Sequence, residues 1–279
     1  MLSLLPDEES YPDVIHKAMH YSLLAGGKRL RPVLVIAASE AVGGDREAVL
    51  PFAVAAEMIH TYTLIHDDLP ALDNDDLRRG KPTNHKVFGE AIAILAGDAL
   101  LTQAFILMTR SVGMENIPPD CLLNAAHEMA VALSSTGMIG GQVVDLESEG
   151  KPIDAATLEY IHIYKTGFLI RACIRCGGIL SQATPRQLNS LSRFGAHIGL
   201  AFQIIDDILD ITGDEKELGK DVGSDLEKDK ATYPALYGLE ASRCKADELV
   251  KDSIACLEEF DNRADPLREI ARFFVQRTF

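Results

Sequence analysis

Two aspartate-rich segments carry the residues of this chain best suited to chemistry. The first is the run His66–Asp73 and the second is the run Gln203–Asp210. In both runs carboxylates interrupt an apolar pattern of helical spacing, and a buried carboxylate is costly unless it is paired or binds a cation. Two such segments facing each other across a helical cavity would hold several hard divalent ions, whose open positions suit a diphosphate substrate.

The second segment has the spacing of one helical face. Asp206 and Asp210 are four residues apart, and Gln203 borders the same face. The alternative is a solvated, charged helix face, but the surrounding isoleucines and leucines argue against it. In the first segment, Asp67 and Asp73 are six apart and would point in different directions on an ideal helix. Pro70 lies between them, so a bulge or a helix end is expected to bring them together.

Adjacent cations follow the first segment. Arg78 and Arg79 could bind diphosphate oxygens with paired hydrogen bonds, and the alternative is surface ion pairing with Asp75 and Asp76.

A second group of cations lies nearer the N-terminus. The run Gly26–Pro32 is rich in glycine and cations, and Lys28 and Arg31 could share a helical face and hold a diphosphate without metal. His60 lies two turns before Asp67, although a lone histidine is more often structural.

Further cations stand in apolar or glycine-containing surroundings. Lys165 interrupts an apolar helical run and needs an anionic partner. The stretch 219–234 is predicted to be a flap that brings Lys220 and Lys230 over a bound anion, with a plain solvated loop as the alternative.

Composition excludes several functions. A net charge of −15 argues against general binding to nucleic acid and to anionic membranes.

The five cysteines are irregularly spaced, and Cys173 and Cys176 are expected to be buried thiols in a reducing cytoplasm. The longest apolar stretch, 91–108, is interrupted by polar residues, so no stable membrane insertion is expected.

Helical periodicity dominates the chain and predicts an all-α fold. No loop is long enough to mark a domain boundary, so residues 1–279 are predicted to form a single domain. The helices are expected at 12–25, 29–43, 46–68, 86–111, 117–135, 138–147, 154–177, 185–211, 231–239, 241–260 and 265–276.

Together these motifs resemble those of the trans-isoprenyl diphosphate synthases, and especially the bacterial farnesyl and the bacterial or plant geranylgeranyl enzymes. The resemblance runs from about Tyr11 to the C-terminus. It implies a helical bundle of about ten helices around a deep central cavity, usually in a homodimer. Family members carry a further helical stretch ahead of the position of Tyr11, which would be short or truncated in this chain.

The resemblance also assigns roles. It implies about three Mg²⁺ ions, replaceable by Mn²⁺, with Asp67, Asp73 and Asp206 as the main ligands. The supporting ligands would be Asp68, Asp207 and Asp210. The allylic diphosphate would be held by Arg78, Lys165, Lys220 and Lys230. Isopentenyl diphosphate would be held by Lys28, Arg31, His60 and Arg79. Thr166 and Gln203 would face the developing allylic cation.

By this resemblance the chain joins isopentenyl diphosphate to dimethylallyl or geranyl diphosphate, head to tail and in the trans configuration, with release of diphosphate. Tyr62 and Thr63 lie one turn or so before Asp67, so they are expected near the growing tail, with Tyr62 as the floor. This pattern favours farnesyl over geranylgeranyl diphosphate as the product. The alternative is that Tyr62 only packs the core while a residue of the stretch 91–108 sets the length.

Three other functions agree less well with these motifs. A terpene cyclase would lack the run Gly26–Pro32, and a non-catalytic subunit of a heteromeric prenyl synthase would be expected to lose one aspartate motif. A plain Mg²⁺- or Ca²⁺-binding helical protein would leave the basic residues unexplained.

Overall fold

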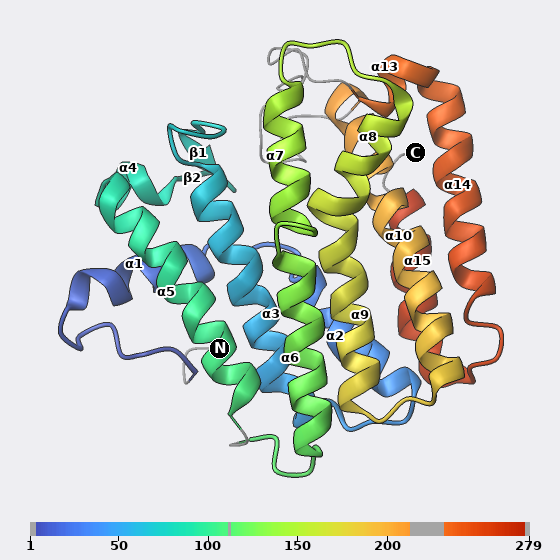
Figure 1. Ribbon diagram of the computed structural model, residues 1–279, viewed down its shortest axis with the longest axis horizontal. Helices are drawn as coiled ribbons and strands as arrows, with labels where there is room; N and C mark the ends of the chain where they lie inside the picture. The colour runs from blue at the N-terminus through green and yellow to red at the C-terminus, as the bar shows by residue number, and fades with distance from the viewer. Residues whose placement is uncertain (1–3, 111–112, 213–231, 277–279) are drawn as a thin grey trace. The chain divides into compact units, whose positions relative to one another are not determined.

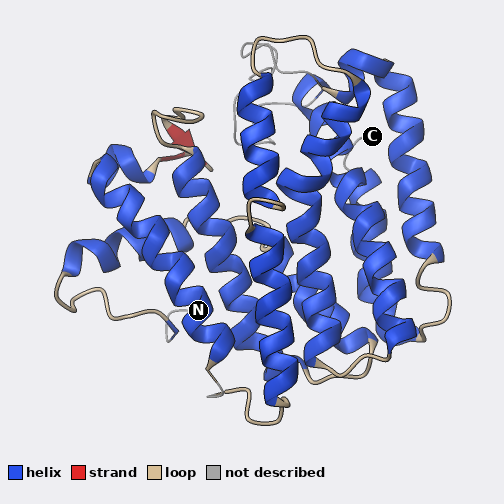
Figure 2. Ribbon diagram, in the orientation of Figure 1, coloured by secondary structure: helices blue, strands red, loops and turns tan. Residues whose placement is uncertain are grey.

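The computed structural model describes residues 4–110, 113–212 and 232–276, and helices make up almost all of their regular structure (Figures 1 and 2). The all-α prediction is therefore confirmed. The N-terminal elements are α1 (Asp13–Leu23), α2 (Leu30–Ala41), α3 (Arg46–Asp67), strands β1 (Leu77–Arg78) and β2 (Lys81–Pro82), α4 (Asn84–Phe88) and α5 (Glu90–Thr109). The later elements are α6 (Pro119–Leu133), α7 (Met138–Ser148), α8 (Ala155–Ile161), η2 (His162–Gly167), α9 (Phe168–Leu180), α10 (Pro185–Thr212), α13 (Tyr233–Tyr237), α14 (Leu239–Ala255), η3 (Asn262–Ala264) and α15 (Asp265–Gln276).

The chain forms two compact units. The first comprises Met1–Val33 and Glu47–Asn116, and the second comprises Leu34–Arg46 and Ile117–Phe279. The first Asp segment belongs to the first unit and the second Asp segment belongs to the second unit.

Helix α3 forms the core of the first unit. Phe52, Met58 and Ile59 on this helix are fully buried, and the buried set continues almost without interruption to Ile65. A helix that is apolar nearly all round is typical of a central core helix. The first Asp segment therefore begins where the most buried helix of this unit ends.

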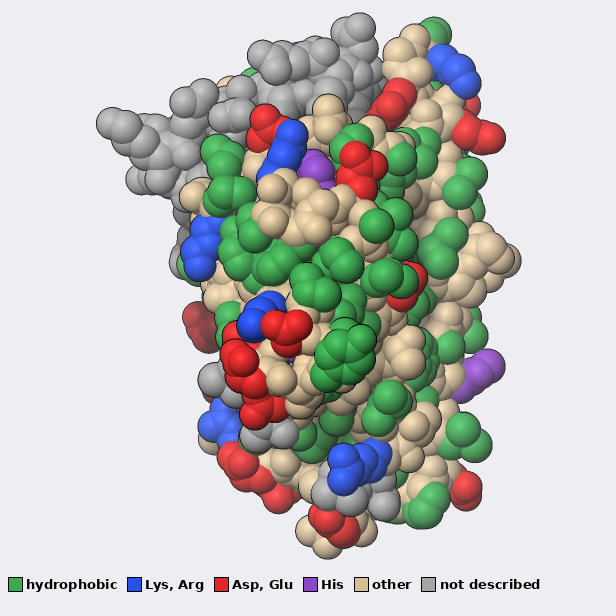
Figure 3. All heavy atoms as spheres, turned by 90° about the vertical axis from the view of Figure 1, so that its left-hand side faces the viewer, with side chains coloured by type: hydrophobic (Ala, Val, Ile, Leu, Met, Phe, Trp, Pro, Cys, Tyr) green, Lys and Arg blue, Asp and Glu red, His purple; other side chains and the backbone are tan. Residues whose placement is uncertain are grey.

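Helix α5 is also apolar nearly all round but is less buried than α3. Ile94, Leu95 and Ile106 are among its exposed side chains. Figure 3 looks onto the side of the molecule that carries α1, α4 and α5, where hydrophobic side chains are widespread. By length and composition alone, α3, α5 and the stretch Pro119–Ser148 could each cross a membrane, and only 39% of the apolar window of α5 is buried.

In the second unit α10 packs against α9, η2 and α14. Its apolar face is buried through Phe194, Ile198, Ile204 and Ile208. The core position of this helix means that carboxylates placed between those residues are held on a rigid element. The unit thus positions the second Asp segment through packing.

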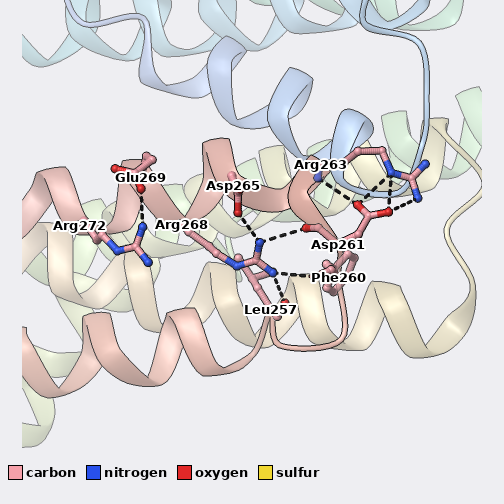
Figure 4. A network of polar contacts seen from close by, with 8 residues as sticks. All are labelled: Leu257, Phe260, Asp261, Arg263, Asp265, Arg268, Glu269 and Arg272. Atoms are coloured by element: carbon pink, nitrogen blue, oxygen red, sulfur yellow. Dashed lines mark hydrogen bonds and ion pairs between the residues drawn. The ribbon is translucent and has the colours of Figure 1, made fainter.

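Arg268 on α15 stabilises the turn between α14 and α15 through hydrogen bonds (Figure 4). Its guanidinium donates to the carbonyl oxygens of Leu257 at 2.6 Å, Phe260 at 2.8 Å and Asp261 at 3.0 Å, and to the Asp265 carboxylate at 2.6 Å. Carbonyls after a helix end have no partner within the helix. One half-buried arginine therefore donates to three of them at once, and the carbonyls of Leu257 and Asp261 also accept from the N–H groups of Phe260 and Ala264.

Three features differ from the predicted elements. The helix expected at 86–111 is divided at Gly89, whose φ of +85° suits glycine and ends α4. The helix expected at 154–177 contains the π-helical turn η2 and continues to Leu180. Strands β1 and β2 form a short antiparallel hairpin. Strands of two residues are too short to show an alternating pattern, so the sequence does not predict them.

Candidate active site

The first Asp segment folds back on the end of α3. The N–H of Asp73 donates to the carbonyl oxygen of Asp67 at 2.8 Å, and the N–H of Asn74 donates to that of Leu69 at 3.1 Å. Asn74 adopts a φ of +53°, a conformation that asparagine tolerates better than most residues. The expectation that a helix end near Pro70 brings Asp67 and Asp73 together is confirmed for their backbones.

Asp68 lies in contact with Arg78. The Arg78 guanidinium donates to Asp68 at 2.5 Å and to Asp75 at 3.3 Å. Burial raises the pKa of Asp68 to about 7, and the opposing charge of Arg78 does not outweigh that effect. Ion pairing, the alternative to diphosphate binding by Arg78, does occur, with the buried Asp68 as well as with Asp75. Asp76 pairs instead with Lys86 at 2.7 Å.

Arg79 reaches the glycine-rich run. Its guanidinium donates to the carbonyl oxygen of Gly26 and lies directly over Gly27, where a side chain at position 27 would strike it. Glycine is favoured at position 27 by its φ of +114°, and the absence of a side chain leaves room for the guanidinium.

The expected pairing of Lys28 and Arg31 on one helical face is wrong. Helix α2 begins at Leu30, so Lys28 precedes it, and Arg29 between them has a φ of +52°. Gly26 and Gly27 before it also have positive φ angles, so the backbone ahead of Leu30 is not helical. The Arg29 side chain forms an ion pair with the buried carboxylate of Glu57 at 2.7 Å.

His60 lies beside this cationic cluster. Burial lowers the pKa of His60 well below its usual value, and the charges of Arg31, Arg79, Arg78 and Arg29 lower it further. The imidazole is therefore neutral near pH 7. The structure thus brings His60, Arg31 and Arg79 into one electrostatic environment.

The second Asp segment lies on α10 as predicted. Asp207 and Asp210 are buried, whereas Asp206 and Gln203 are partly exposed. Gly199, one turn before Gln203, packs on Gly167 so closely that a side chain at position 199 would lie 2.8 Å from the Cα of Gly167. This close contact holds η2, which carries Thr166, against α10.

Lys165 has the anionic partner expected for a lysine in an apolar helical run. Its Nζ donates to the Asp145 carboxylate on α7 at 2.5 Å. Gly141, one turn earlier on α7, lies against the Lys165 backbone, where a side chain would strike the backbone nitrogen. A single glycine therefore lets α7 approach η2 and brings the acid to the lysine.

Comparison with known proteins identifies the family of the chain. Residues 12–267 match the model of the polyprenyl synthetase family. The chain belongs to that family. It is 55% identical over 234 residues to a farnesyl diphosphate synthase of Geobacillus stearothermophilus, covering 84% of this chain and 78% of that protein. It is 49% identical over 267 residues to a geranylgeranyl diphosphate synthase of Cyanophora paradoxa, covering 95% and 88%.

A solved structure agrees with the family assignment. The apo crystal structure of an FPP/GFPP synthase from Zymomonas mobilis superposes with a TM-score of 0.88 at 41% identity, covering 98% of this chain and 92% of that one. This polyprenyl synthetase is therefore a trans-prenyltransferase with the all-helical fold of its relatives.

The structure adds residues that the sequence patterns did not single out in this polyprenyl synthetase. His162 on η2 is buried with its Nε2 3.3 Å from Asp207, and the N–H of Tyr233 donates to the same carboxylate oxygen at 2.8 Å. His162 is far from Asp207 in the sequence, so no local pattern reveals the contact. The predicted ligands Lys220 and Lys230 lie outside the described residues.

Tyr62 and Thr63 lie near the end of α3. Tyr62 is 7% exposed, and its ring packs edge-on against His66 with the centroids 5.7 Å apart. Burial raises the pKa of Tyr62 to about 12, with a further contribution from Asp67. Thr63 donates to the carbonyl oxygen of His60 at 2.8 Å, so its hydroxyl is tied to the helix backbone.

The donor set of this polyprenyl synthetase fits a hard cation. Carboxylate oxygens are the ligands that Mg²⁺ prefers, and both Asp segments supply them on helix ends or faces. The pKa of about 7 at Asp68 shows that local cations do not fully stabilise its charged form, so an added divalent ion would favour ionisation. Within the described ranges, no three His, Cys, Asp or Glu side chains converge to enclose an ion by themselves.

Proposed function

We propose that this chain is a farnesyl diphosphate synthase that adds isopentenyl diphosphate to dimethylallyl and then geranyl diphosphate. The observation that carries the product length is Tyr62, a large, buried side chain one turn before the first Asp segment. A bulky ring at this point would stop a growing tail after fifteen carbons. The relatives with farnesyl names support the proposal, and those with geranylgeranyl names keep a twenty-carbon product as the second candidate.

Mg²⁺ is the proposed metal, with about three ions held by Asp67, Asp73 and Asp206 and supported by Asp68, Asp207 and Asp210. When bound, the metal supplies charge stabilisation to the diphosphate leaving group. Arg78, Lys165, Lys220 and Lys230 are proposed to hold the same diphosphate, so that the allylic carbon–oxygen bond can ionise.

The second substrate is proposed to lie among the cations of the first unit. Lys28, Arg31 and Arg79, with the neutral His60, would hold the diphosphate of isopentenyl diphosphate and aim its double bond at the allylic cation. The hydroxyl of Thr166 and the amide of Gln203 would face that cation with their oxygens. The proton lost from the new carbon skeleton would go to the released diphosphate, so no protein nucleophile is needed.

We also propose a homodimer in the cytoplasm. The support is the apolar helix α5, whose exposed Ile94, Leu95 and Ile106 would be covered by a second copy. Light scattering of the purified protein at micromolar concentration is expected to give the mass of a dimer. A monomer under these conditions would contradict this part of the proposal.

The decisive assay supplies radiolabelled isopentenyl diphosphate with dimethylallyl, geranyl or farnesyl diphosphate and separates the dephosphorylated products. Fifteen-carbon alcohol should dominate with the first two partners, and farnesyl diphosphate should be a poor acceptor. Mainly twenty-carbon alcohol would overturn the farnesyl assignment. A pure chain without activity that gains it from a second, related subunit would instead support a non-catalytic role.

A further inference from the structure

Arg79 has an unusual backbone conformation for its side chain. Its φ is +55°, and Gly80 follows with a φ of +73°, between the paired residues Arg78 and Lys81. Two consecutive positive φ angles make a hairpin turn of the primed type, for which asparagine, aspartate and glycine are preferred. A long side chain in the left-handed region persists only where its surroundings enforce the conformation.

Part of that enforcement comes from the hairpin itself. Thr83 is 1% exposed, its N–H donates to the carbonyl oxygen of Asp76 at 3.0 Å, and its hydroxyl donates to that of Asp75 at 2.8 Å. These bonds close the base of the hairpin. They do not fix the direction in which the hairpin points, because both partners belong to the same loop.

The direction is fixed by α1. The Tyr21 hydroxyl donates to the carbonyl oxygen of Pro82 at 2.8 Å. The side-chain amide of Asn84 donates to the Ala18 carbonyl oxygen at 2.9 Å and to the Ser22 hydroxyl at 2.8 Å. Asn84 is 2% exposed, so these bonds are made away from water, where an unmade bond is costly.

We propose that Tyr21 and Asn84 are positioning residues for substrate binding. They hold the hairpin against α1, so that the Arg79 guanidinium stays at the carbonyl oxygen of Gly26. Their effect falls on isopentenyl diphosphate rather than on the allylic substrate. The inference rests on the proposed function, which assigns Arg79 to that diphosphate.

Two substitutions separate positioning from packing. Tyr21→Phe removes only the hydroxyl, because the phenyl ring can keep its edge-on contact with Phe88 at a centroid distance of 5.6 Å. Asn84→Asp keeps the shape but replaces the amide donor with an oxygen that faces the Ala18 carbonyl. Lys86→Ala is the matched control, since the Lys86 side chain on neighbouring α4 forms an exposed ion pair with Asp76, and an exposed pair contributes little to stability.

Hydrogen exchange measured on peptides covering residues 76–83 reports the position of the hairpin without substrate. Both variants should exchange faster there than the parent protein, with other peptides of the first unit unchanged. In steady-state kinetics, KM for isopentenyl diphosphate should rise about five-fold in Tyr21→Phe, as expected for one ordinary hydrogen bond, and more in Asn84→Asp. KM for the allylic substrate should stay within about two-fold, and Lys86→Ala should match the parent in both measurements.

Each contrary outcome has a distinct meaning. Unchanged exchange in both variants would overturn the role of α1, and faster exchange with unchanged KM would overturn the link to substrate. An equal rise in both KM values would overturn the selectivity. If Asn84→Asp does not fold, Tyr21→Phe decides. An Arg79→Ala variant with normal KM for isopentenyl diphosphate would overturn the proposed role of Arg79 and the substrate part of the inference, while the exchange data would still test the contact with α1.

Discussion

The backbone N–H of Asp73 is hydrogen-bonded to the carbonyl oxygen of Asp67 at 2.8 Å. This bond closes the turn that follows α3 and places two residues, six apart in sequence, at one helix end. The last carbonyls of a helix have no partner within it, so the turn also satisfies one of them. A motif whose spacing is wrong for a helix face thus brings its two aspartates to one helix end because the helix stops inside it.

Removing a carboxylate from either Asp segment should abolish most activity. Asp67→Ala and Asp206→Ala are expected to lower kcat by a factor on the order of 100 to 1,000, because stabilisation of the leaving diphosphate is the main catalytic effect. Asp120→Ala, on the exposed start of α6, is the control and should be neutral. Chelation of divalent metal should abolish the activity of the parent enzyme. Near-normal turnover in both site variants would remove these residues from the site.

The cations should divide between the two substrates. Lys28→Ala, Arg31→Ala and Arg79→Ala should mainly raise KM for isopentenyl diphosphate, whereas Lys165→Ala and Lys220→Ala should act on the allylic substrate. Each missing charged hydrogen bond is expected to cost about 1.5 to 3 kcal/mol, or roughly ten-fold or more in KM. Kinetics with one substrate varied at a time measures the division. Similar effects on both substrates throughout would argue against two separate diphosphate sites.

His60 should make stability depend on pH. Its pKa in the folded protein lies well below 6.5, so below pH 6.5 the unfolded chain takes up a proton that the folded protein does not. The free energy of unfolding should therefore fall as the pH drops below 6.5, by at most about 1.4 kcal/mol per pH unit from this residue. Urea titrations between pH 5.5 and 7.5 should show a shallower slope for His60→Asn. His127→Asn, at an exposed position on α6, should keep the parent slope.

Tyr62 should limit product length. Tyr62→Ala opens a cavity of side-chain size and should lengthen the main product by at least one five-carbon unit. Tyr62→Phe keeps the ring and should leave the product unchanged. Chromatography of the dephosphorylated products is the measurement. An unchanged length in Tyr62→Ala would favour a residue of α5 as the true limit.

Arg268 should matter for stability but not for chemistry. Arg268→Met removes the arginine donor from the carbonyls of Leu257, Phe260 and Asp261, of which only the first and last keep a backbone N–H donor. The change should cost about 2 to 4 kcal/mol and lower Tm by roughly 5 to 10 °C. Arg272→Met is the control, because that arginine makes an exposed pair with Glu269 and should change stability by less than about 0.5 kcal/mol. Equal melting temperatures for the two variants would contradict the role of Arg268.

Much of this fold is predictable because long helices have strong periodicity. The periodicity predicts a helix at 185–211, and helix α10 spans Pro185–Thr212. Because the helix is predicted correctly, so is the position of its carboxylates along it. The contacts of Asp207 with His162 and Tyr233 are not predictable in the same way, since they join residues far apart in sequence. The ion pair between Arg29 and the distant Glu57 is likewise tertiary, and such pairings leave no local signature.

The π-helical turn η2 changes the angular phase of everything that follows it. An α-helix advances about 100° per residue, so the one extra residue in a π turn rotates the downstream helix by about that angle relative to an uninterrupted one. Deleting Ile163 would restore a regular helix from α8 into α9. The deletion would then either turn Lys165 and Thr166 away from their neighbours or turn the buried face of α9 toward water. A one-residue gap at this point in a related sequence would therefore mark a protein with a rebuilt substrate site.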